Sequence, residues 1–270
     1  MIDFVRKLYR AGGKLYGPGR QRGERVQWKP ALIYPDDVFI VSYPKSGNTW
    51  VRFLIANLLK QPGEEIDFYT SNTFIPEVGT HTEIIERLER PRVMKSHAPC
   101  VREYPRVIYV IRDGRDVYVS YYFHRLEKLP HNTTFKEFLE RDDHFPSLWG
   151  DHVASWLFKE RTPSGSILVV RYEDLLNDAL AQLRHMVEFI GLERTEGELQ
   201  HAVEAASFKN MRRLEVQKGR PYKDSGPDLF VREGRWGGWK ELFGTEEKAI
   251  FKAREGNILV RLGYERDNTW

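Results

Sequence analysis

The segment YPKSGNTW at residues 43–50 places a lysine and several hydroxyl or amide side chains between an apolar run and an amphipathic run. A turn between a strand and a helix aims consecutive backbone N–H groups and the positive end of the helix dipole at one point, which is how many proteins hold phosphate. The residues that would line such a site are Lys45, Ser46, Gly47, Asn48 and Thr49. The lysine precedes the glycine, so the order is not that of a Walker A loop. The segment predicts a P-loop-like phosphate site of another type.

A second candidate segment, RDGRDVYVS at residues 112–120, follows the apolar run 107–111. Arg112 would end a strand and Ser120 would lie about one turn into the next helix, so both could reach the sheet edge where open α/β folds bind ligands. We expect this pair to bind a second phosphate. The alternative is a capped surface turn stabilised by ion pairs, which is the commoner role of such a segment taken alone.

Two basic side chains that could act on a reacting group, Lys95 and His97, stand at the end of another apolar run. Residues two apart in a strand project from the same face of a sheet, so both would face one site. A histidine can accept a proton from an attacking hydroxyl near neutral pH, and a lysine can stabilise negative charge on the transferred group. The alternative is a structural histidine that only forms a hydrogen bond.

The fourth candidate segment, residues 231–240, contains Arg232 and Gly234 and ends a long stretch rich in glycine and proline. The stretch 212–238 shows no sustained periodicity, and loops of that length inside compact domains are usually functional lids or disordered. We predict a lid without regular structure, which closes when Arg232 contacts a bound phosphate. A glycine-rich turn anchored by tryptophans is the alternative.

The elements that must position these residues alternate along the chain, with short runs rich in Val, Ile and Tyr between longer amphipathic runs. This pattern is typical of parallel strands joined by helical crossovers. The predicted strands are 38–43, 92–96, 107–112 and 167–172, and the predicted helices are 48–60, 116–126, 178–190 and 196–207. Gly191 would end the third helix, and Thr195 with Glu198 would cap the fourth. We therefore predict an α/β fold in a single domain, with a mostly parallel central sheet flanked by helices and the site at the carboxyl ends of the strands.

The four segments resemble, in the same order, the motifs of the sulfotransferases of the soluble cytosolic type, which use 3′-phosphoadenosine 5′-phosphosulfate (PAPS). YPKSGNTW resembles the 5′-phosphosulfate loop of that family, and Arg112 and Ser120 have the eight-residue separation of its 3′-phosphate motif. Lys95, His97 and Pro99 match its Lys-x-His-x-Pro signature. The resemblance spans residues 36–262, and four matches in order are improbable by chance.

The resemblance implies a nucleotide site and a catalytic group. The residues implied to bind PAPS are Lys45, Ser46, Gly47, Asn48, Thr49, Trp50, Arg112, Ser120, Tyr172, Phe208, Arg232 and Gly234. Trp50 and Phe208 resemble the pair that sandwiches adenine, and Tyr172 resembles a tyrosine that contacts the base. His97 would act as the general base, Lys45 and Lys95 would stabilise charge on the sulfonate and the departing phosphate, and no metal is implied.

Residues 231–240 also depart from the family pattern. Glu233 stands where the family has a lysine, and Gly238 stands where it has an aspartate. A cationic contact to the 3′-phosphate is therefore missing or reversed in sign. Two other functions stay open from the residues alone: a P-loop-type kinase of a small metabolite, which would need Mg²⁺, and a nucleotide-binding module without catalysis. Product formation from PAPS would distinguish the three.

The composition indicates which kind of partner and which cellular compartment to expect. Basic residues number 42 and acidic residues 39, giving a net charge of +3, so no large positive field favours a nucleic-acid partner. Cys100 is the only cysteine, which suits a reducing compartment and leads us to expect a cytoplasmic location. We expect a small-molecule acceptor, whose identity the sequence leaves open together with the oligomeric state.

Residues 1–35 are expected to form a basic N-terminal arm ahead of the sulfotransferase domain at 36–270. The first 29 residues hold eight basic and two acidic residues. Ile2, Val5 and Leu8 could share one helix face, so weak contact of the arm with an anionic membrane surface is one expectation. An arm that packs on the protein or is mobile is the favoured alternative.

Overall fold

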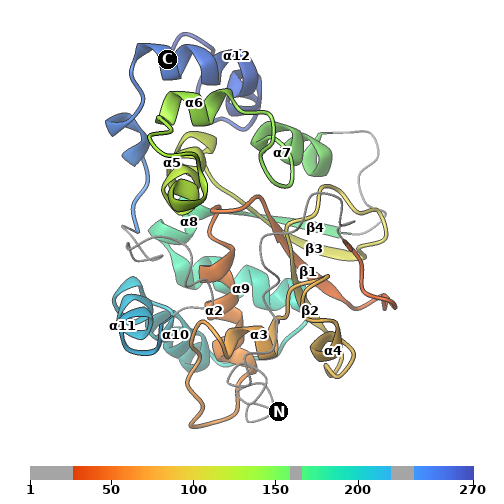
Figure 1. The fold of residues 1–270 in the computed structure, drawn as a ribbon. Helices are drawn as coiled ribbons and strands as arrows, with labels where there is room; N and C mark the ends of the chain where they lie inside the picture. The colour runs from red at the N-terminus through yellow and green to blue at the C-terminus, as the bar shows by residue number, and fades with distance from the viewer. Residues whose placement is uncertain (1–26, 159–165, 220–233) are drawn as a thin grey trace.

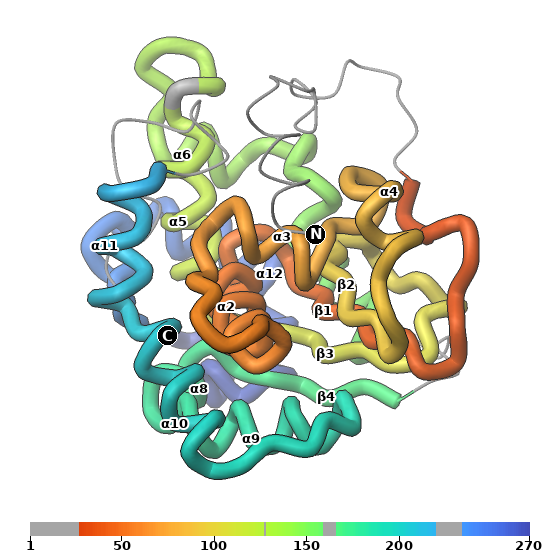
Figure 2. The backbone as a smooth tube through the Cα atoms, turned by 90° about the horizontal axis from the view of Figure 1, so that it is seen from below, coloured from red at the N-terminus to blue at the C-terminus, as the bar shows by residue number. Residues whose placement is uncertain are grey.

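The computed structural model describes residues 27–158, 166–219 and 234–270. Its centre is a sheet of four parallel strands in the order β2-β1-β3-β4 (Figures 1 and 2). The strands are β1 (Val38–Ser42), β2 (Val93–Ser96), β3 (Arg106–Ile111) and β4 (Ser166–Arg171). Each neighbouring pair is parallel. The predicted α/β fold with a parallel sheet is confirmed.

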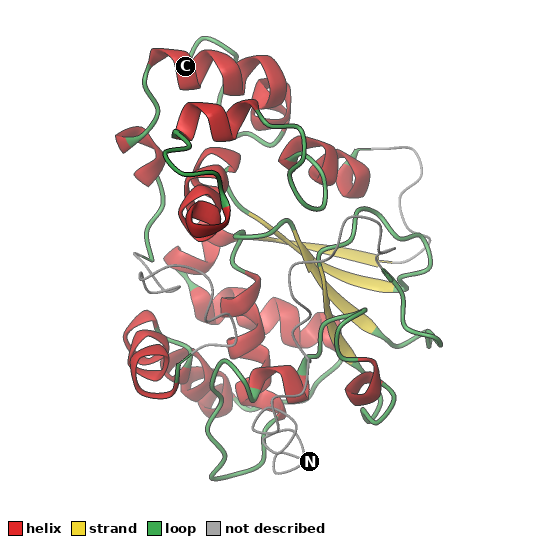
Figure 3. Cartoon of the chain, in the orientation of Figure 1, coloured by secondary structure: helices red, strands yellow, loops and turns green. Residues whose placement is uncertain are grey.

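Two hydrophobic cores lie on opposite faces of the sheet, because successive side chains of a strand point to opposite sides. Phe39, Val41 and Tyr109 belong to one core, whereas Ile40 and Ile108 belong to the other. The first core is covered by α5 (Gly114–Arg125), α6 (Phe135–Glu140), α7 (Trp149–Leu157) and α12 (Thr245–Arg261). The second is covered by α2 (Asn48–Leu59), α8 (Tyr172–Asn177), α9 (Ala179–Ile190), α10 (Glu196–Ala205) and α11 (Phe208–Lys218). The result is a sheet between two layers of helices (Figure 3).

Short helices complete the described chain: α3 (Ser71–Phe74), α4 (Thr82–Ile85), η1 (Leu126–Lys128) and η2 (Gly238–Glu241). Two predicted helix ends are confirmed. Gly191 has a φ of 79° at the end of α9, in the left-handed region that glycine tolerates. The Thr195 and Glu198 side chains form the predicted capping box at the start of α10.

The prediction that residues 212–238 lack regular structure is wrong for the first part of that stretch. Residues 212–218 belong to α11, which begins after the cap Ser207 and buries Met211 and Leu214 one turn apart. The glycines that suggested a loop begin only at Gly219, where the helix ends at a φ of 75°. Residues 220–233, which include Arg232 and most of the predicted lid, lie outside the described residues.

Other boundaries also differ from the prediction. Tyr172 begins α8 and does not end a strand, and α5 begins at Gly114, two residues before the predicted start. The long helix α12 was not predicted. It is positioned by packing of Phe251 and Leu259 against the first core. Its formation therefore depends on tertiary contacts more than on its own periodicity.

The predicted arm falls partly within the described chain. Residues 27–35 pack on the domain: the Tyr104 hydroxyl donates to the carbonyl of Trp28, and Arg92 donates to the carbonyl of Leu32 at 2.8 Å. The expected membrane contact of residues 1–26 lies outside the described residues. Among the helices that the structure describes, none has both the length and the apolarity needed to cross a bilayer.

Candidate active site

The carboxyl ends of all four strands bring the candidate segments to one edge of the sheet. Ser42 of β1 pairs with Val110 of β3, and Ile111 of β3 pairs with Arg171 of β4, so these strands end at nearly the same level. The segments that follow the strand ends start at Tyr43, His97, Arg112 and Tyr172. This edge is where open α/β sheets bind ligands.

The turn between β1 and α2 has the backbone of an anion site. Lys45 and Gly47 both have positive φ, 69° and 103°, in the left-handed region. Such alternation turns backbone N–H groups toward a common point. No side chain caps the α2 N-terminus and no acidic residue lies in its first turn. The first N–H groups and the positive end of the helix dipole thus face the turn without a competing protein anion.

The polar side chains of this turn play different parts. Ser46 is 1% exposed, and its Oγ has no hydrogen-bond partner among the described residues. A buried hydroxyl without a partner is unfavourable unless a ligand supplies one, so Ser46 fits an anionic ligand. Asn48 points the other way: its Nδ2 donates to the Ile40 carbonyl at 3.3 Å and to Ser42 Oγ at 3.2 Å. Asn48 thereby ties the turn to β1. Thr49 is partly exposed in the first turn of α2.

Arg112 joins the two phosphate segments. Its NH1 donates to the Lys45 carbonyl at 3.3 Å, and its guanidinium carbon lies 4.4 Å from the ring centre of Tyr172. Its NH2 donates to the carbonyl of Arg235 at 3.2 Å, while Nε is buried and has no partner among the described residues. Arg112 therefore stands where the phosphate turn, the start of α8 and the glycine-rich segment meet, with donor capacity left for an anion.

The aromatic residues expected around adenine lie in two groups. Trp50 packs edge-on against Tyr172, with ring centres 5.8 Å apart. Tyr172 also packs on Gly47, where an added Cβ would lie 2.7 Å from the ring. Phe208, which is 39% exposed, packs on Gly234 in the same way, at 2.6 Å. The rings of Tyr172 and Phe208 thus each lie close to a glycine of a different phosphate segment.

The structure gives the least information about two of the residues expected to bind the 3′-phosphate, Ser120 and Arg232. Ser120 lies in the second turn of α5 and is partly exposed. Arg232 lies outside the described residues. Unlike α2, helix α5 has a capped N-terminus, because Asp113 accepts from the backbone of Arg115. A second phosphate at this segment would therefore depend on side chains and not on the helix end.

Asp116, which the sequence analysis did not select, holds the glycine-rich segment in place. It is 3% exposed, and its carboxylate accepts from the backbone N–H of Gly237 at 2.7 Å and of Trp239 at 2.9 Å. Next to it, the Arg115 guanidinium lies between the rings of Trp239 and Trp270, at 4.0 and 4.5 Å from their centres.

His97 has one ring nitrogen fixed and the other available. Its Nδ1 lies 2.6 Å from the backbone carbonyl of Ser42. A carbonyl only accepts, so Nδ1 carries the proton and Nε2 of the neutral ring has a free lone pair. Burial, and then the positive charge of Lys95, lower the pKa of His97 to about 3. The ring is therefore neutral near pH 7, the state that a general base needs.

Lys95 forms an ion pair beside His97. Its Nζ lies 3.0 Å from a carboxylate oxygen of Glu77, with the lysine side chain 8% exposed. Burial lowers the pKa of Lys95, and the carboxylate opposes that shift. Burial alone would raise the pKa of Glu77, but the charges of Lys95 and His97 bring it down to about 2. The pair is thus ionised, and Glu77 comes from a loop in which no sequence pattern marked it.

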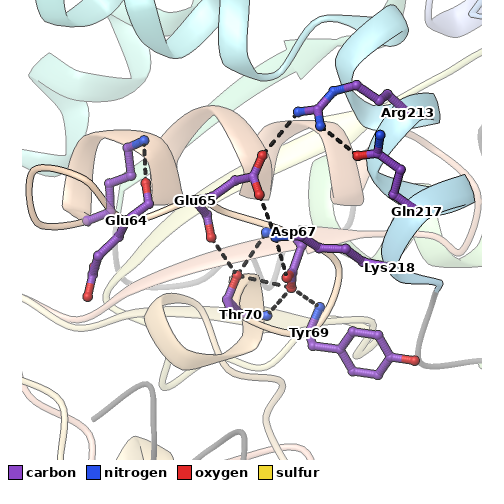
Figure 4. Close-up of polar contacts among 9 residues, drawn as sticks. Glu64, Glu65, Asp67, Tyr69, Thr70, Arg213, Gln217 and Lys218 are labelled. Carbon is purple, nitrogen blue, oxygen red and sulfur yellow. Dashed lines mark hydrogen bonds and ion pairs between the residues drawn. The ribbon is translucent and has the colours of Figure 1, made fainter.

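Helix α11, which carries Phe208, is anchored at its other end by a cluster of charges (Figure 4). Glu65 accepts from Arg213 at 3.0 Å and from Lys218, and Lys218 also lies 3.5 Å from Asp67. Asp67 in turn accepts from the backbone of Tyr69 at 2.9 Å. These contacts join the end of α11 to the segment between α2 and α3.

The similarity to known proteins shows the family to which the chain belongs. Residues 35–254 match the sulfotransferase domain model. The chain belongs to the sulfotransferase family. It is 30% identical to sulfotransferase 1A1 of Bos taurus over 245 residues, which cover 82% of each chain. It is 29% identical to flavonol 4′-sulfotransferase of Flaveria chlorifolia over 244 residues, covering 78% of this chain and 75% of the relative.

Two solved structures have the same fold. Mouse sulfotransferase SULT7A1, crystallised with PAP, matches with a TM-score of 0.61 at 23% identity and covers 86% of this chain and 88% of its own. Retinol dehydratase in a complex with retinol and PAP matches with a TM-score of 0.65 at 20% identity, over 84% and 82% of the two chains. The sequence-based expectation of a sulfotransferase enzyme is confirmed, and the kinase alternative is set aside.

Proposed function

We propose that this sulfotransferase transfers the sulfonate of PAPS to a hydroxyl or amine of a small-molecule acceptor, with His97 as the general base. One observation carries the proposal: His97 is anchored on Ser42, three residues before Lys45, so the base and the phosphate turn share one strand end. The donor and the acceptor would therefore meet at the end of β1. The names of the solved structures with PAP support the same donor.

The residues present fit the nucleotide. The turn at 45–49 and the N-terminus of α2 hold the 5′-phosphosulfate, where Ser46 Oγ gains a partner. Arg112, whose Nε has no partner in the described part of the chain, binds the 3′-phosphate together with Ser120, Arg232 and the backbone near Gly234. Trp50, Tyr172 and Phe208 contact the base. When bound, PAPS supplies an activated sulfonate whose leaving group is adenosine 3′,5′-bisphosphate.

His97 Nε2 accepts the proton of the acceptor as the acceptor atom attacks sulfur in line. A bond forms between sulfur and the acceptor atom while the bond from sulfur to the 5′-phosphate oxygen breaks. Lys45 and Lys95 stabilise the negative charge that collects on that oxygen and on the sulfonate. The Lys95 ammonium group has three N–H donors. One is directed at Glu77, which leaves two that can stabilise this negative charge.

The test is transfer from sulfur-labelled PAPS to a panel of phenols, alcohols and amines, run with wild type and with His97→Ala. We expect labelled product with at least one acceptor class. The kcat of His97→Ala should fall by about 10²-fold or more, the usual effect of removing a general base, while the affinity for adenosine 3′,5′-bisphosphate stays unchanged. The exposed His201 gives the matched control, since His201→Ala should keep its kcat. A kcat of His97→Ala near that of wild type would refute the assignment of the base.

A cytoplasmic location belongs to the same proposal, because the single cysteine and the family fit a reducing compartment. The acceptor class and any contact of residues 1–26 with a membrane surface stay predictions.

A further inference from the structure

One face of α7 holds the loop that carries His97. Trp156 Nε1 donates to the backbone carbonyl of Ala98 at 2.9 Å, and Ser155 Oγ accepts from the backbone N–H of Cys100 at 3.1 Å. His152 lies one turn earlier on the same helix and is fully buried. The spacing i, i+3, i+4 places all three side chains on one helix face.

His152 is oriented from the sheet side by Tyr109 of β3. The Tyr109 hydroxyl lies 2.9 Å from Nδ1 of His152, and burial raises the pKa of Tyr109 well above 10, so the hydroxyl keeps its proton. Burial lowers the pKa of His152 to about 4, while the backbone of Ala98 and His97 opposes the shift. A neutral ring that accepts at Nδ1 carries its proton on Nε2. This N–H forms no hydrogen bond among the described residues, and His152 is linked to the loop through its backbone carbonyl, which accepts from the Ser155 hydroxyl at 2.7 Å.

We propose that His152, Ser155 and Trp156 are positioning residues, which fix the backbone of residues 97–100 and so hold the His97 imidazole where it can accept the acceptor proton. The inference rests on the proposed role of His97 as general base. The ring itself is tied at one short contact, Nδ1 to the Ser42 carbonyl, so its place depends on where the loop lies. A base displaced by about 1 Å transfers protons far less well.

The experiment compares two matched variants. Tyr109→Phe removes the hydroxyl that orients His152. Tyr122→Phe removes another hydroxyl, which donates at 2.8 Å to the Thr133 carbonyl, a group outside α7 and the loop of His97. Both should lower the melting temperature. Only Tyr109→Phe should lower kcat, by about tenfold, the usual effect of losing an outer partner of a functional side chain. The KM for PAPS should stay unchanged in both.

The same two changes in a His97→Ala background separate this inference from the proposed function. If Tyr109 acts through His97, Tyr109→Phe should reduce kcat no further once His97 is gone. An equal loss with and without His97 would overturn the positioning role and leave the base assignment intact. A normal kcat for His97→Ala alone would overturn both. Trp156→Phe removes the donor to Ala98 and keeps an aromatic ring, so it should show the same loss of kcat as Tyr109→Phe. A Trp156→Phe enzyme with normal kcat would contradict the positioning role of Trp156.

Discussion

At the scale of single residues, the site depends on a histidine that stays neutral. The ordinary pKa of the side chain, 6.5, would leave part of it protonated near neutral pH. Burial and the neighbouring Lys95 lower that pKa to about 3, and the Ser42 carbonyl fixes the tautomer. Both effects act on one side chain, and both leave Nε2 free to accept a proton.

This shift predicts an unusual pH profile. The base form exists above the pKa, so kcat/KM for the acceptor, which at saturating PAPS reports the enzyme with the donor bound, should stay level as the pH falls from about 7.5 to about 5.5. The measurement is kcat/KM at saturating PAPS, with an acceptor that does not titrate in this range. An acid limb with a midpoint near 6.5 would mean that His97 is exposed to solvent in the working enzyme.

At the scale of elements, the turn between β1 and α2 depends on glycine. Gly47 has a φ of 103° and a Cβ there would lie 2.7 Å from Tyr172, whose ring contacts Arg112. A side chain would strain the backbone and also displace the tyrosine. Gly63 has a φ of 83° but nothing within 4 Å of an added Cβ, so a side chain there would strain the backbone alone.

This difference makes the two glycines a matched pair. We expect Gly63→Ala to lower the free energy of unfolding by about 1–3 kcal/mol without changing nucleotide affinity. Gly47→Ala should lower it at least as much and should also weaken binding of adenosine 3′,5′-bisphosphate by about tenfold, equivalent to ~1.4 kcal/mol. Denaturant unfolding and calorimetry measure the two effects. Unchanged affinity in Gly47→Ala would show that the Tyr172 contact is unimportant for the nucleotide.

At the scale of the whole molecule, a buried carboxyl group links three helices on one face of the sheet. Glu255 of α12 accepts from the Tyr118 hydroxyl of α5 at 2.9 Å and from the Gly150 N–H of α7 at 2.8 Å. Burial, opposed by these hydrogen bonds, raises its pKa from 4.5 to about 7. The helix that bears Ser120 and the helix behind His97 are therefore joined through one titratable group.

The raised pKa makes stability depend on pH. The folded state binds the Glu255 proton more tightly than the unfolded chain does. The stabilisation that this proton gives the folded state is therefore fully present below pH 4.5 and is lost as the pH rises through about 7. A shift of this size corresponds to about 3 kcal/mol. Urea unfolding should show that Glu255→Gln flattens the fall in stability between about pH 5 and pH 8. Replacing the exposed Glu188 by Gln should leave that fall unchanged, and an equal slope in Glu255→Gln and wild type would contradict the prediction.

The sequence by itself determined the features that local chemistry specifies. Short apolar runs that alternate with amphipathic runs predicted four parallel strands. This prediction needed no tertiary information, because such runs are patterns of neighbouring residues. The caps at Gly191 and Thr195 followed from single residues and short spacings. The order of the motifs indicated the family, and since the first three motifs stand at strand ends, parallel pairing was enough to predict that these three meet at one edge.

Only the tertiary structure decided what surrounds those residues. Glu77 beside Lys95, Asp116 on the glycine-rich segment and His152 behind His97 are contacts between segments far apart in the chain, and no local period marks them. Helix α12 formed for the same reason, since its stability comes from packing. Asn48 turned toward β1 because a buried amide must find partners, and those partners exist only after the strand and helix have met.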